Sequence, residues 1–403
     1  MVLTIDRNTF LWHEGERGLA YNSSNNKYFI FEVSREIKKA LVTLDMPENL
    51  YMVEIPDNFD KDEKLNEWIQ NLFRIGSGRI FTNMDSAEAS LKPIVKILYD
   101  REKLLSNGDY IGMLSSVREI TVHLNGASLH QEDNKLFQQY FHPMISDRSL
   151  GYMDVLSFIS RFPNTVSINF IGDFSKYSHL PELIKRLEDR MSYITFYSRI
   201  EDLALVEEKK RNILNSCNLV VLCNGNPKNK EYLSLIESSF ENKRVDYLCS
   251  SEEDISFVES IELKKNIIKI IPFYNGNNIE FLRKYVFLNE DEIFQQKLDK
   301  RKIFINQTLN GFFYGKILVL PDGSVKANAN TTRLGDIHDS LCELLNSLFN
   351  KESTWFRTRV YGPCDNCIYQ WLCPPVSNYE LITGCGFFCN VNHVETVNSS
   401  SCL

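Results

Sequence analysis

The sequence predicts an α/β fold built around a parallel sheet, and two patterns in the middle of the chain support it. Six apolar runs rich in β-branched or aromatic residues, typical of buried parallel strands, lie between residues 119 and 275. Helical patterns separate them, and this alternation indicates parallel strands joined by right-handed crossovers. Six units are too few for a closed eightfold barrel, so an open, partial (β/α)6 barrel or a doubly wound sheet fits. In both folds, ligands bind beyond the carboxyl ends of the strands.

Each strand and helix of this region is predicted from its own run of residues. Apolar residues on one face and a proline in the first turn predict a helix over 181–187. Helical spacing of apolar residues predicts another over 231–240. The strand-like runs begin near Ile120, Val166, Tyr193, Asn218, Val245 and Ile267.

Residues 1–84 follow a different pattern, which predicts a winged-helix-like α+β module. Two aromatic runs, 10–12 and 27–31, flank a polar tract and indicate a β-hairpin. Ser34 is the expected N-cap of a helix that buries Ile37 and Leu41. A generic α+β cap is the alternative. The remaining elements are a strand over 50–55, a helix over 60–73 and a strand over 79–82.

Composition narrows the function. The chain has 403 residues, 43% of them hydrophobic, and a formal net charge of −8, which disfavours non-specific binding to nucleic acid. No run of eighteen apolar residues occurs, so no membrane-spanning helix is expected. The N-terminus lacks a basic segment followed by an apolar core, so no secretory signal is expected and the predicted location is the cytoplasm.

The C-terminal region, from residue 286, has a predicted hairpin over 316–326 and a helix over 339–349, followed by a cluster of cysteines. None of the ten cysteines precedes Cys217, and five lie between Cys364 and Cys389. Clustered cysteines in a reducing compartment indicate metal or redox chemistry. Tetrahedral thiolate ligation selects zinc or an iron–sulfur cluster, and a reduced, apolar cysteine-rich core is the alternative.

The motif C-x₂-C-x₅-C after a glycine hairpin resembles the SPASM domain, the auxiliary-cluster domain of radical S-adenosylmethionine (SAM) peptide maturases. The longer run CDNCIYQWLCPPVSNYELITG is similar to pseudo-radical-SAM proteins found beside peptide-modification genes in Bacteroidales-type bacteria. The resemblance is sharpest over residues 315–392. It implies three domains: a winged-helix-like, leader-peptide-recognition-like module over 1–84, a partial radical-SAM-like (β/α)6 barrel over 85–285 and a SPASM-like domain over 286–403.

The resemblance also implies a ligand set. The site of the second SPASM cluster would hold one [4Fe–4S] cluster or, alternatively, zinc. Cys385 or His393 could take the place of Cys389 as its fourth ligand. The first SPASM cluster is expected to be lost, because Asn328 and Ser377 stand where the family has cysteines. The four implied ligands are Cys364, Cys367, Cys373 and Cys389.

The catalytic motif of the family is absent. Radical SAM enzymes carry C-x₃-C-x₂-C in the loop after the first barrel strand, and here that loop, NGASLHQEDNK, has no cysteine. The resemblance therefore implies no radical SAM activity and no catalytic residues of that kind. Gly172 and Asp173 stand where the family has its SAM-binding G-G-E motif. They are either a remnant SAM site or an ordinary strand-end turn, and SAM as a cofactor is not expected.

Cys223 and Cys249 end the fourth and fifth predicted strands and are either a redox pair or buried structural cysteines. The leading hypothesis is a catalytically degenerate accessory protein of ribosomal peptide maturation. It would bind a precursor peptide in a groove between the N-terminal hairpin and the helix at 37–41, or bind a partner maturase, but neither nucleic acid nor membrane. The alternatives are a SAM-binding or redox enzyme acting on a peptide, and a zinc-stapled scaffold without redox role.

Overall fold

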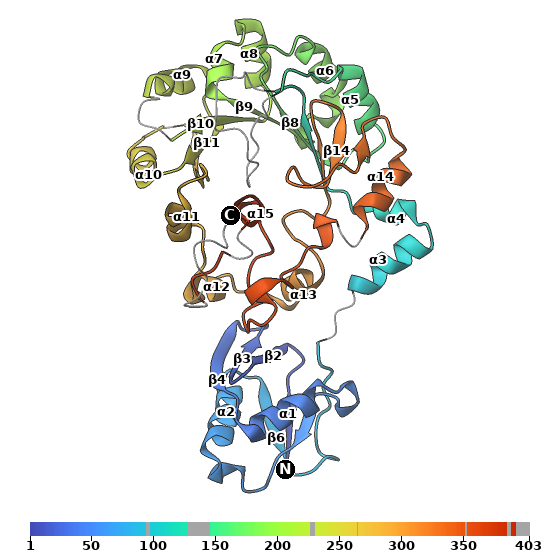
Figure 1. Cartoon of the computed structure of the whole chain (residues 1–403), viewed down its shortest axis with the longest axis vertical. Helices are drawn as coiled ribbons and strands as arrows, with labels where there is room; N and C mark the ends of the chain where they lie inside the picture. The colour runs from blue at the N-terminus through green and yellow to red at the C-terminus, as the bar shows by residue number, and fades with distance from the viewer. Residues whose placement is uncertain are drawn as a thin grey trace. The chain divides into compact units, whose positions relative to one another are not determined.

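In the computed structural model the chain forms two compact units (Figure 1). Unit 1 comprises Met1–Asp100, Leu288–Leu309 and Thr358–Pro375, and unit 2 comprises Arg101–Phe287, Asn310–Arg357 and Val376–Leu403. The three-domain division stays a prediction. No described helix is both long and apolar enough to cross a bilayer. The described residues are 1–93, 97–126, 146–225, 230–263, 265–350, 353–384 and 388–391.

Unit 2 contains a nine-stranded mixed sheet in the order β12-β11-β10-β9-β8-β7-β13-β14-β15. Strands β7 to β12 are parallel, each to the next, and β13 is parallel to β7, whereas β14 and β15 are antiparallel additions. The strands are β7 (Glu119–His123), β8 (Ser167–Ile171), β9 (Ile194–Arg199), β10 (Leu219–Asn224), β11 (Arg244–Cys249), β12 (Ile267–Pro272), β13 (Lys316–Val319), β14 (Ser324–Lys326) and β15 (Gly335–Asp336).

All six predicted strand runs of this sheet are confirmed, and so is the α/β class. The six predicted strands follow one another in sequence order, and β13, which is also parallel, pairs with β7 on the side away from β8. The choice between a partial barrel and a doubly wound sheet stays a prediction. The hairpin over 316–326 is also confirmed, with its turn at Gly323, whose φ of +86° is readily adopted by glycine.

Helices cover one face of this sheet. Figure 1 shows α5, α6, α8, α9 and α10 along the same side of the strands. Strand residues such as Phe170 and Val221 pack against helix residues such as Phe158 in one large apolar core. Side chains alternate between the two faces of a strand, so the neighbours of these apolar residues point to the opposite face of the sheet. That face includes buried polar residues, among them His123 and Asn169.

Three helices of unit 2 were predicted from the sequence and are confirmed. Helix α6 corresponds to the helix predicted over 181–187, α9 to the one over 231–240 and α14 to the one over 339–349. Helix α3 (Ile97–Ser106) begins in unit 1 and ends in unit 2. The other helices of unit 2 are α4 (Tyr110–Ser115), α5 (Tyr152–Ile159), α6 (Leu180–Arg186), α7 (Ile200–Ala204), α8 (Glu208–Asn215), α9 (Glu231–Ser239), α10 (Glu252–Glu259), α11 (Ile279–Tyr285), α14 (Leu341–Leu348) and α15 (Asn378–Thr383).

The N-terminal part of unit 1 has two three-stranded sheets, in the orders β5-β1-β6 and β2-β3-β4, and two helices. Ser34 caps α1 as predicted, since its Oγ accepts a hydrogen bond from the Ile37 amide at 3.3 Å. Leu41, Trp68 and other apolar residues form the core. The elements are β1 (Val2–Ile5), β2 (Thr9–Glu14), β3 (Arg17–Asn22), β4 (Lys27–Glu32), α1 (Arg35–Asp45), β5 (Met52–Glu54), α2 (Glu63–Arg74) and β6 (Gly78–Phe81).

The predicted N-terminal hairpin is wrong in its pairing. The two aromatic runs do not pair with each other, because β3 lies between β2 and β4 and bonds to both. Gly15, with a φ of +56°, permits the tight turn from β2 into β3. Residues Arg17–Asn22 have few β-branched side chains, so local propensity did not indicate this central strand.

Two later segments of the chain pack on this module within unit 1. One contains α12 (Glu290–Gln295) and α13 (Lys300–Thr308), and the other is the cysteine segment, residues 364–373. The Tyr28 and Phe294 rings stack with centroids 3.4 Å apart. The Tyr369 hydroxyl donates to Glu290 at 2.9 Å and accepts from Arg17 at 3.4 Å. The β2-β3-β4 sheet, α12–α13 and the cysteine segment are therefore joined by direct contacts.

Candidate functional site

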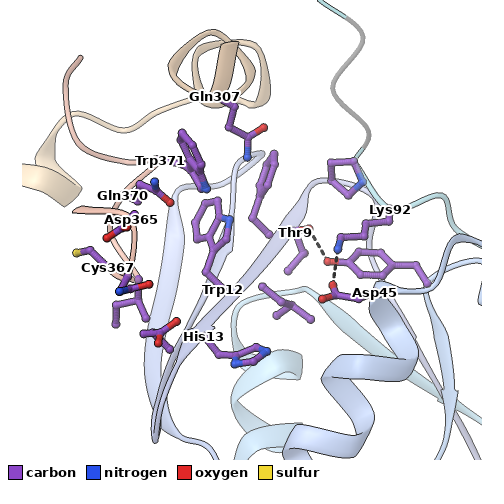
Figure 2. A pocket seen from close by; sticks show the side chains of 17 residues that line it. Thr9, Trp12, His13, Asp45, Lys92, Gln307, Asp365, Cys367, Gln370 and Trp371 are labelled. Carbon is purple, nitrogen blue, oxygen red and sulfur yellow. Dashed lines mark hydrogen bonds and ion pairs between the residues drawn. The ribbon is translucent and has the colours of Figure 1, made fainter. Parts of the chain in front are cut away.

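A cavity of about 380 Å³ in unit 1 lies along β2, between that strand and the cysteine segment (Figure 2). We call it the β2 groove. It is open on one side and mixed in chemistry, with indole, amide and carboxylate side chains. Its lining residues are Thr9–Glu14, Asp45, Tyr51, Lys92, Pro93, Gln307, Asp365, Asn366, Cys367, Ile368, Gln370 and Trp371.

The groove follows the edge of β2 and not one of its faces. All six consecutive residues of the strand line it, whereas a cavity on one face would contact only alternate residues. β2 is the outer strand of its sheet, with β3 as its only neighbour in the sheet order. An outer strand directs half of its backbone N–H and C=O groups away from the sheet.

The register identifies which backbone groups face the groove. The Ser23 amide donates to the Asn8 carbonyl at 2.9 Å, so the pair Asn8–Ser23 is hydrogen-bonded. Because hydrogen-bonded and non-bonded pairs alternate in an antiparallel ladder, Phe10, Trp12 and Glu14 bond to β3. The backbone groups of Thr9, Leu11 and His13 therefore point to the open edge.

The backbone groups of one of these three residues, Thr9, already form hydrogen bonds within unit 1. The Thr9 amide donates to the Asp6 carbonyl, and the Thr9 carbonyl accepts from the Tyr51 hydroxyl, both at 2.9 Å. Leu11 and His13 are left as the two residues whose donor and acceptor pairs are directed into the groove. Leu11 and His13 are two residues apart, which is the spacing at which residues of an outer strand direct their backbone groups away from the sheet.

The cysteine segment forms the facing wall and is anchored to α13. The Asn306 side-chain amide donates to the carbonyls of Trp371 and Cys373, each at 3.1 Å. At its other side, the Gln370 amide donates to the Arg359 carbonyl. The wall is therefore held by hydrogen bonds to its backbone from Asn306 and by a hydrogen bond from its own Gln370 side chain to the backbone of Arg359.

Two tryptophans line the groove from opposite walls, Trp12 on β2 and Trp371 on the cysteine segment (Figure 2). Both are half-buried. Trp12 stacks on Phe10 with ring centroids 5.3 Å apart, and Phe10 in turn contacts the Phe304 ring edge-on at 5.8 Å. These contacts hold the Trp12 indole in place and leave it beside the cavity.

Carboxylates outnumber cations along the groove. Glu14 and Asp365 are exposed and lie on opposite walls. The lysine of the lining, Lys92, forms an ion pair with Asp45 (Figure 2). The part of the groove beside Glu14 and Asp365 is therefore acidic.

The four predicted metal ligands are divided between the two units of the chain. Cys364, Cys367 and Cys373 are half-buried in unit 1, and Cys389 belongs to unit 2. Among the described residues, no three histidine, cysteine, aspartate or glutamate side chains are placed to hold one metal ion. The substitutes Cys385 and His393 lie outside the described residues, and the four-cysteine site stays a prediction.

The two positions where the resemblance implies lost ligands carry polar contacts within unit 2. The Asn328 side-chain amide donates to the Asn378 side chain at 2.7 Å. Ser377, next to Asn378, caps α15, and its backbone amide donates to the Glu380 carboxylate at 2.7 Å. Both positions are thus filled by hydrogen-bonded side chains with local structural roles.

Gly172 and Asp173 form a locked turn at the end of β8. The Asn125 side chain accepts from the Asp173 amide at 2.8 Å and donates to its carbonyl at 2.9 Å. A Cβ on Gly172 would lie 2.3 Å from Asn125 Oδ1, so the turn requires glycine. The buried Asp173 carboxylate accepts from the Ser175 amide and pairs with Lys176 at 2.9 Å. These contacts account for the motif as a strand-end turn, and SAM binding there stays untested.

Cys223 and Cys249 are buried in the helix-facing core of unit 2. Burial raises the pKa of Cys223 well above its ordinary value, and the nearby carboxylates of Glu201 and Asp246 raise it further. Burial and, to a smaller extent, the negative charge of Asp254 raise the pKa of Cys249 to about 12. Thiols with such pKa values stay protonated and are poor nucleophiles, which favours the structural interpretation.

The β2 groove differs from the predicted groove between the N-terminal hairpin and the helix at 37–41, which stays a prediction. Ile37 and Leu41 of that helix are only 1% and 2% exposed and belong to the core. The groove lies instead at the β2 edge and needs the cysteine segment as its second wall. Two signals were available, an aromatic edge strand at Phe10–Trp12 and a tryptophan inside the cysteine motif. The cysteine-free loop after β7 lies almost entirely outside the described residues.

No protein-family model matches this chain, and no curated protein matches it. Among solved structures it is similar to Streptococcus suis SuiB bound to the precursor peptide SuiA, at 14% identity and a TM-score of 0.44, over 97% of this chain and 100% of that one. It is also similar to SuiB bound to S-adenosylmethionine, at 12% identity and a TM-score of 0.44, over 96% and 99%. A likeness at this TM-score carries no argument about the function of this chain.

Proposed function

We propose that this chain is an accessory protein of ribosomal peptide maturation that binds an extended precursor peptide along the open edge of β2. The observation that carries the proposal is the β2 groove, which follows six consecutive residues of an outer strand. Leu11 and His13 direct backbone donors and acceptors into it. Such an edge takes up an extended peptide as an additional strand, the mode called β-augmentation.

The second wall supports a peptide ligand of defined size. A cavity of about 380 Å³ lies within the range of about 300–1,000 Å³ that is usual for ligand pockets. Backbone hydrogen bonds to Leu11 and His13 would supply affinity without regard to sequence, and the side chains of the two walls would supply selectivity. Trp371 and Gln370 on the cysteine segment are placed for that second task.

The accessory role rests on the sequence, because the cysteines that radical SAM enzymes place after the first barrel strand are absent. The bound peptide would then be presented to a partner maturase. A SAM-binding or redox enzyme is the rival. The Asp173 carboxylate is engaged by Ser175 and Lys176, and Cys223 and Cys249 have raised pKa values, so neither place adds an observation in favour of that rival.

The test uses a display library of short random peptides selected on the full-length protein. Enriched peptides are expected to bind the wild type and to lose at least about tenfold in affinity to His13→Pro, which removes one N–H from the groove edge. Proline is tolerated at such outward positions of outer strands.

The matched control is Ile30→Pro on β4, the opposite outer strand of the same sheet. The Val33 amide donates to the Glu16 carbonyl, so by alternation the Ile30 backbone also faces outward, away from β3. Ile30→Pro is expected to leave peptide affinity unchanged. If no peptide is enriched, or if both proline variants bind the enriched peptides like the wild type, the proposal is wrong.

We also propose that Cys364, Cys367, Cys373 and Cys389 bind one metal centre. When bound, an iron–sulfur cluster would supply electron transfer or a structural cross-link, and zinc would supply the cross-link only. The backbone contacts of a bound peptide with Leu11 and His13 do not depend on this proposal, because both residues belong to β2.

Metal analysis decides this second proposal. Protein purified without oxygen is expected to contain about four irons and four sulfides per chain, with broad absorption near roughly 400 nm. About one zinc per chain would indicate the structural alternative. Cys364→Ser should remove the metal, whereas Cys342→Ser, at an exposed cysteine of α14, should not. Protein that contains neither metal, or keeps it in Cys364→Ser, would refute the ligand assignment.

A further inference from the structure

We propose that the β2 groove selects peptides in which a basic and an aromatic residue are separated by one residue. This inference rests on the proposed function and specifies its ligand class. It follows from three features of the described structure: the register of β2, the two half-buried tryptophans and the uneven distribution of charge along the groove.

The register fixes where the side chains of an added strand would lie. Its backbone would bond to Leu11 and His13, so one peptide residue would stand opposite Trp12, between those two positions. In neighbouring strands, residues opposite each other place their side chains on the same face of the sheet. The residue opposite Trp12 therefore presents its side chain on the indole's face, as does the peptide residue opposite Glu14, two positions away.

The position opposite Trp12 favours a large aromatic side chain. Trp68 and Trp355 are 1% and 0% exposed, whereas Trp12 and Trp371 are half-buried and line the groove. The stack of Trp12 on Phe10 and the anchoring of the Trp371 carbonyl by Asn306 hold both walls before a ligand arrives. Preorganised aromatic pockets of this kind are where binding energy concentrates in protein interfaces.

The position opposite Glu14 favours a cation. Glu14 is exposed at the end of β2, and Asp365 contributes a second exposed carboxylate from the other wall. Two cations lie near these carboxylates: Lys92 is paired with Asp45, and Arg17, directly opposite Glu14 on β3, donates to the Tyr369 hydroxyl. A lysine or arginine opposite Glu14 would form a cross-strand ion pair, while an acidic residue there would be repelled.

The two positions define a pattern for each strand direction. In an antiparallel peptide the residue opposite Glu14 precedes the one opposite Trp12, so the order is basic, any residue, aromatic. In a parallel peptide the order is reversed. Peptides with the two residues adjacent would place them on opposite faces of the added strand and lose one of the contacts.

The experiment uses synthetic heptapeptides of threonine and valine with a central Arg-Thr-Phe, a Glu-Thr-Phe or an Arg-Phe-Thr core. Binding is followed by tryptophan fluorescence, which reports on Trp12 and Trp371 because the other two tryptophans are buried. The Arg-Thr-Phe peptide, or its reversed Phe-Thr-Arg form, is expected to bind at least about tenfold more tightly than the other two.

Substitutions at two residues, Trp371 and Glu14, assign the contacts. Trp371→Ala should weaken the Arg-Thr-Phe peptide by about tenfold or more, with Trp371→Phe recovering most of it. Glu14→Gln should weaken only peptides with a basic residue and should remove part of the salt dependence of their affinity. Thermal unfolding of each variant verifies that it is folded.

The outcomes separate this inference from the proposed function. Selected peptides could lose their binding in His13→Pro and yet lack basic and aromatic residues at this spacing. In that case the proposed specificity is wrong and the edge-binding function stands. Equal binding of the three heptapeptides, or an unchanged affinity in Trp371→Ala, also refutes the specificity. If no peptide binds at all, both the specificity and the function are wrong.

Discussion

Replacing Arg199 with methionine is expected to lower the free energy of unfolding by about 3–5 kcal/mol at neutral pH. Arg199 ends β9, and its guanidinium donates two hydrogen bonds to the Asp202 carboxylate on α7, at 2.8 and 2.7 Å. The two side chains are only 8% and 6% exposed. Removing the arginine leaves a buried carboxylate without its cation, and this unpaired charge is the source of the loss. Chemical denaturation measures it.

The exposed pair Arg333–Asp336 provides the control. It has the same residue types at the same spacing within unit 2, with the arginine side chain 56% exposed. Arg333→Met is expected to change stability by less than about 1 kcal/mol, because water screens exposed ion pairs. The double variant Arg199→Met/Asp202→Leu should recover most of the loss. A single Arg199→Met variant as stable as Arg333→Met would contradict the argument.

The loss should also depend on pH. Burial raises the pKa of Asp202, although the hydrogen bonds from Arg199 lower it. A carboxyl with a raised pKa in the folded state contributes stability that is present below its unfolded pKa and is lost as the pH rises through the folded value. Without Arg199 the folded pKa rises further. The deficit of Arg199→Met is therefore expected to be larger at roughly pH 7.5 than at roughly pH 5, where Asp202 is closer to protonation.

The strands of the central sheet could be predicted because their signal is local. Each run combines β-branched and aromatic residues, and the helix-facing residues, such as Phe170 and Val221, are apolar at every second position. The polar residues of the other face, such as His123 and Asn169, interrupt the apolar pattern without removing the β propensity. The central strand β3 escaped prediction because it owes its place to pairing with β2 and β4 and not to its own composition.

The β2 groove could not be predicted for a related reason. Its walls are separated by about the whole length of the chain, since Trp12 and Trp371 come from opposite ends of the sequence. They are brought into one unit by contacts such as the Tyr21 hydroxyl donating to the Leu298 carbonyl at 2.8 Å. No local pattern encodes a hydrogen bond between such distant residues. The cysteine motif was visible in the sequence, but its role as a wall of the groove was not.

Changing Asn306 to aspartate is expected to reduce peptide affinity at the β2 groove by at least about tenfold. The Asn306 amide holds the carbonyls of Trp371 and Cys373, and a carboxylate in its place would lose both hydrogen bonds and repel both oxygens. The cysteine segment would then spend less time against α13. Since affinity falls in proportion to the population of the competent state, binding should weaken although Asn306 is absent from the groove lining.

A readout without peptide makes this expectation independent of the ligand. Release of the segment would expose Trp371, so tryptophan emission should shift to the red and acrylamide should quench it more strongly in Asn306→Asp than in the wild type. Asn306→Ala, which loses the hydrogen bonds without adding repulsion, should fall between the two. Lys302→Gln on the exposed side of α13 changes the net charge by the same amount and should have no effect. If Asn306→Asp keeps both the wild-type emission and the wild-type affinity, the segment is held by other contacts, and Asn306 is not a positioning residue of the groove.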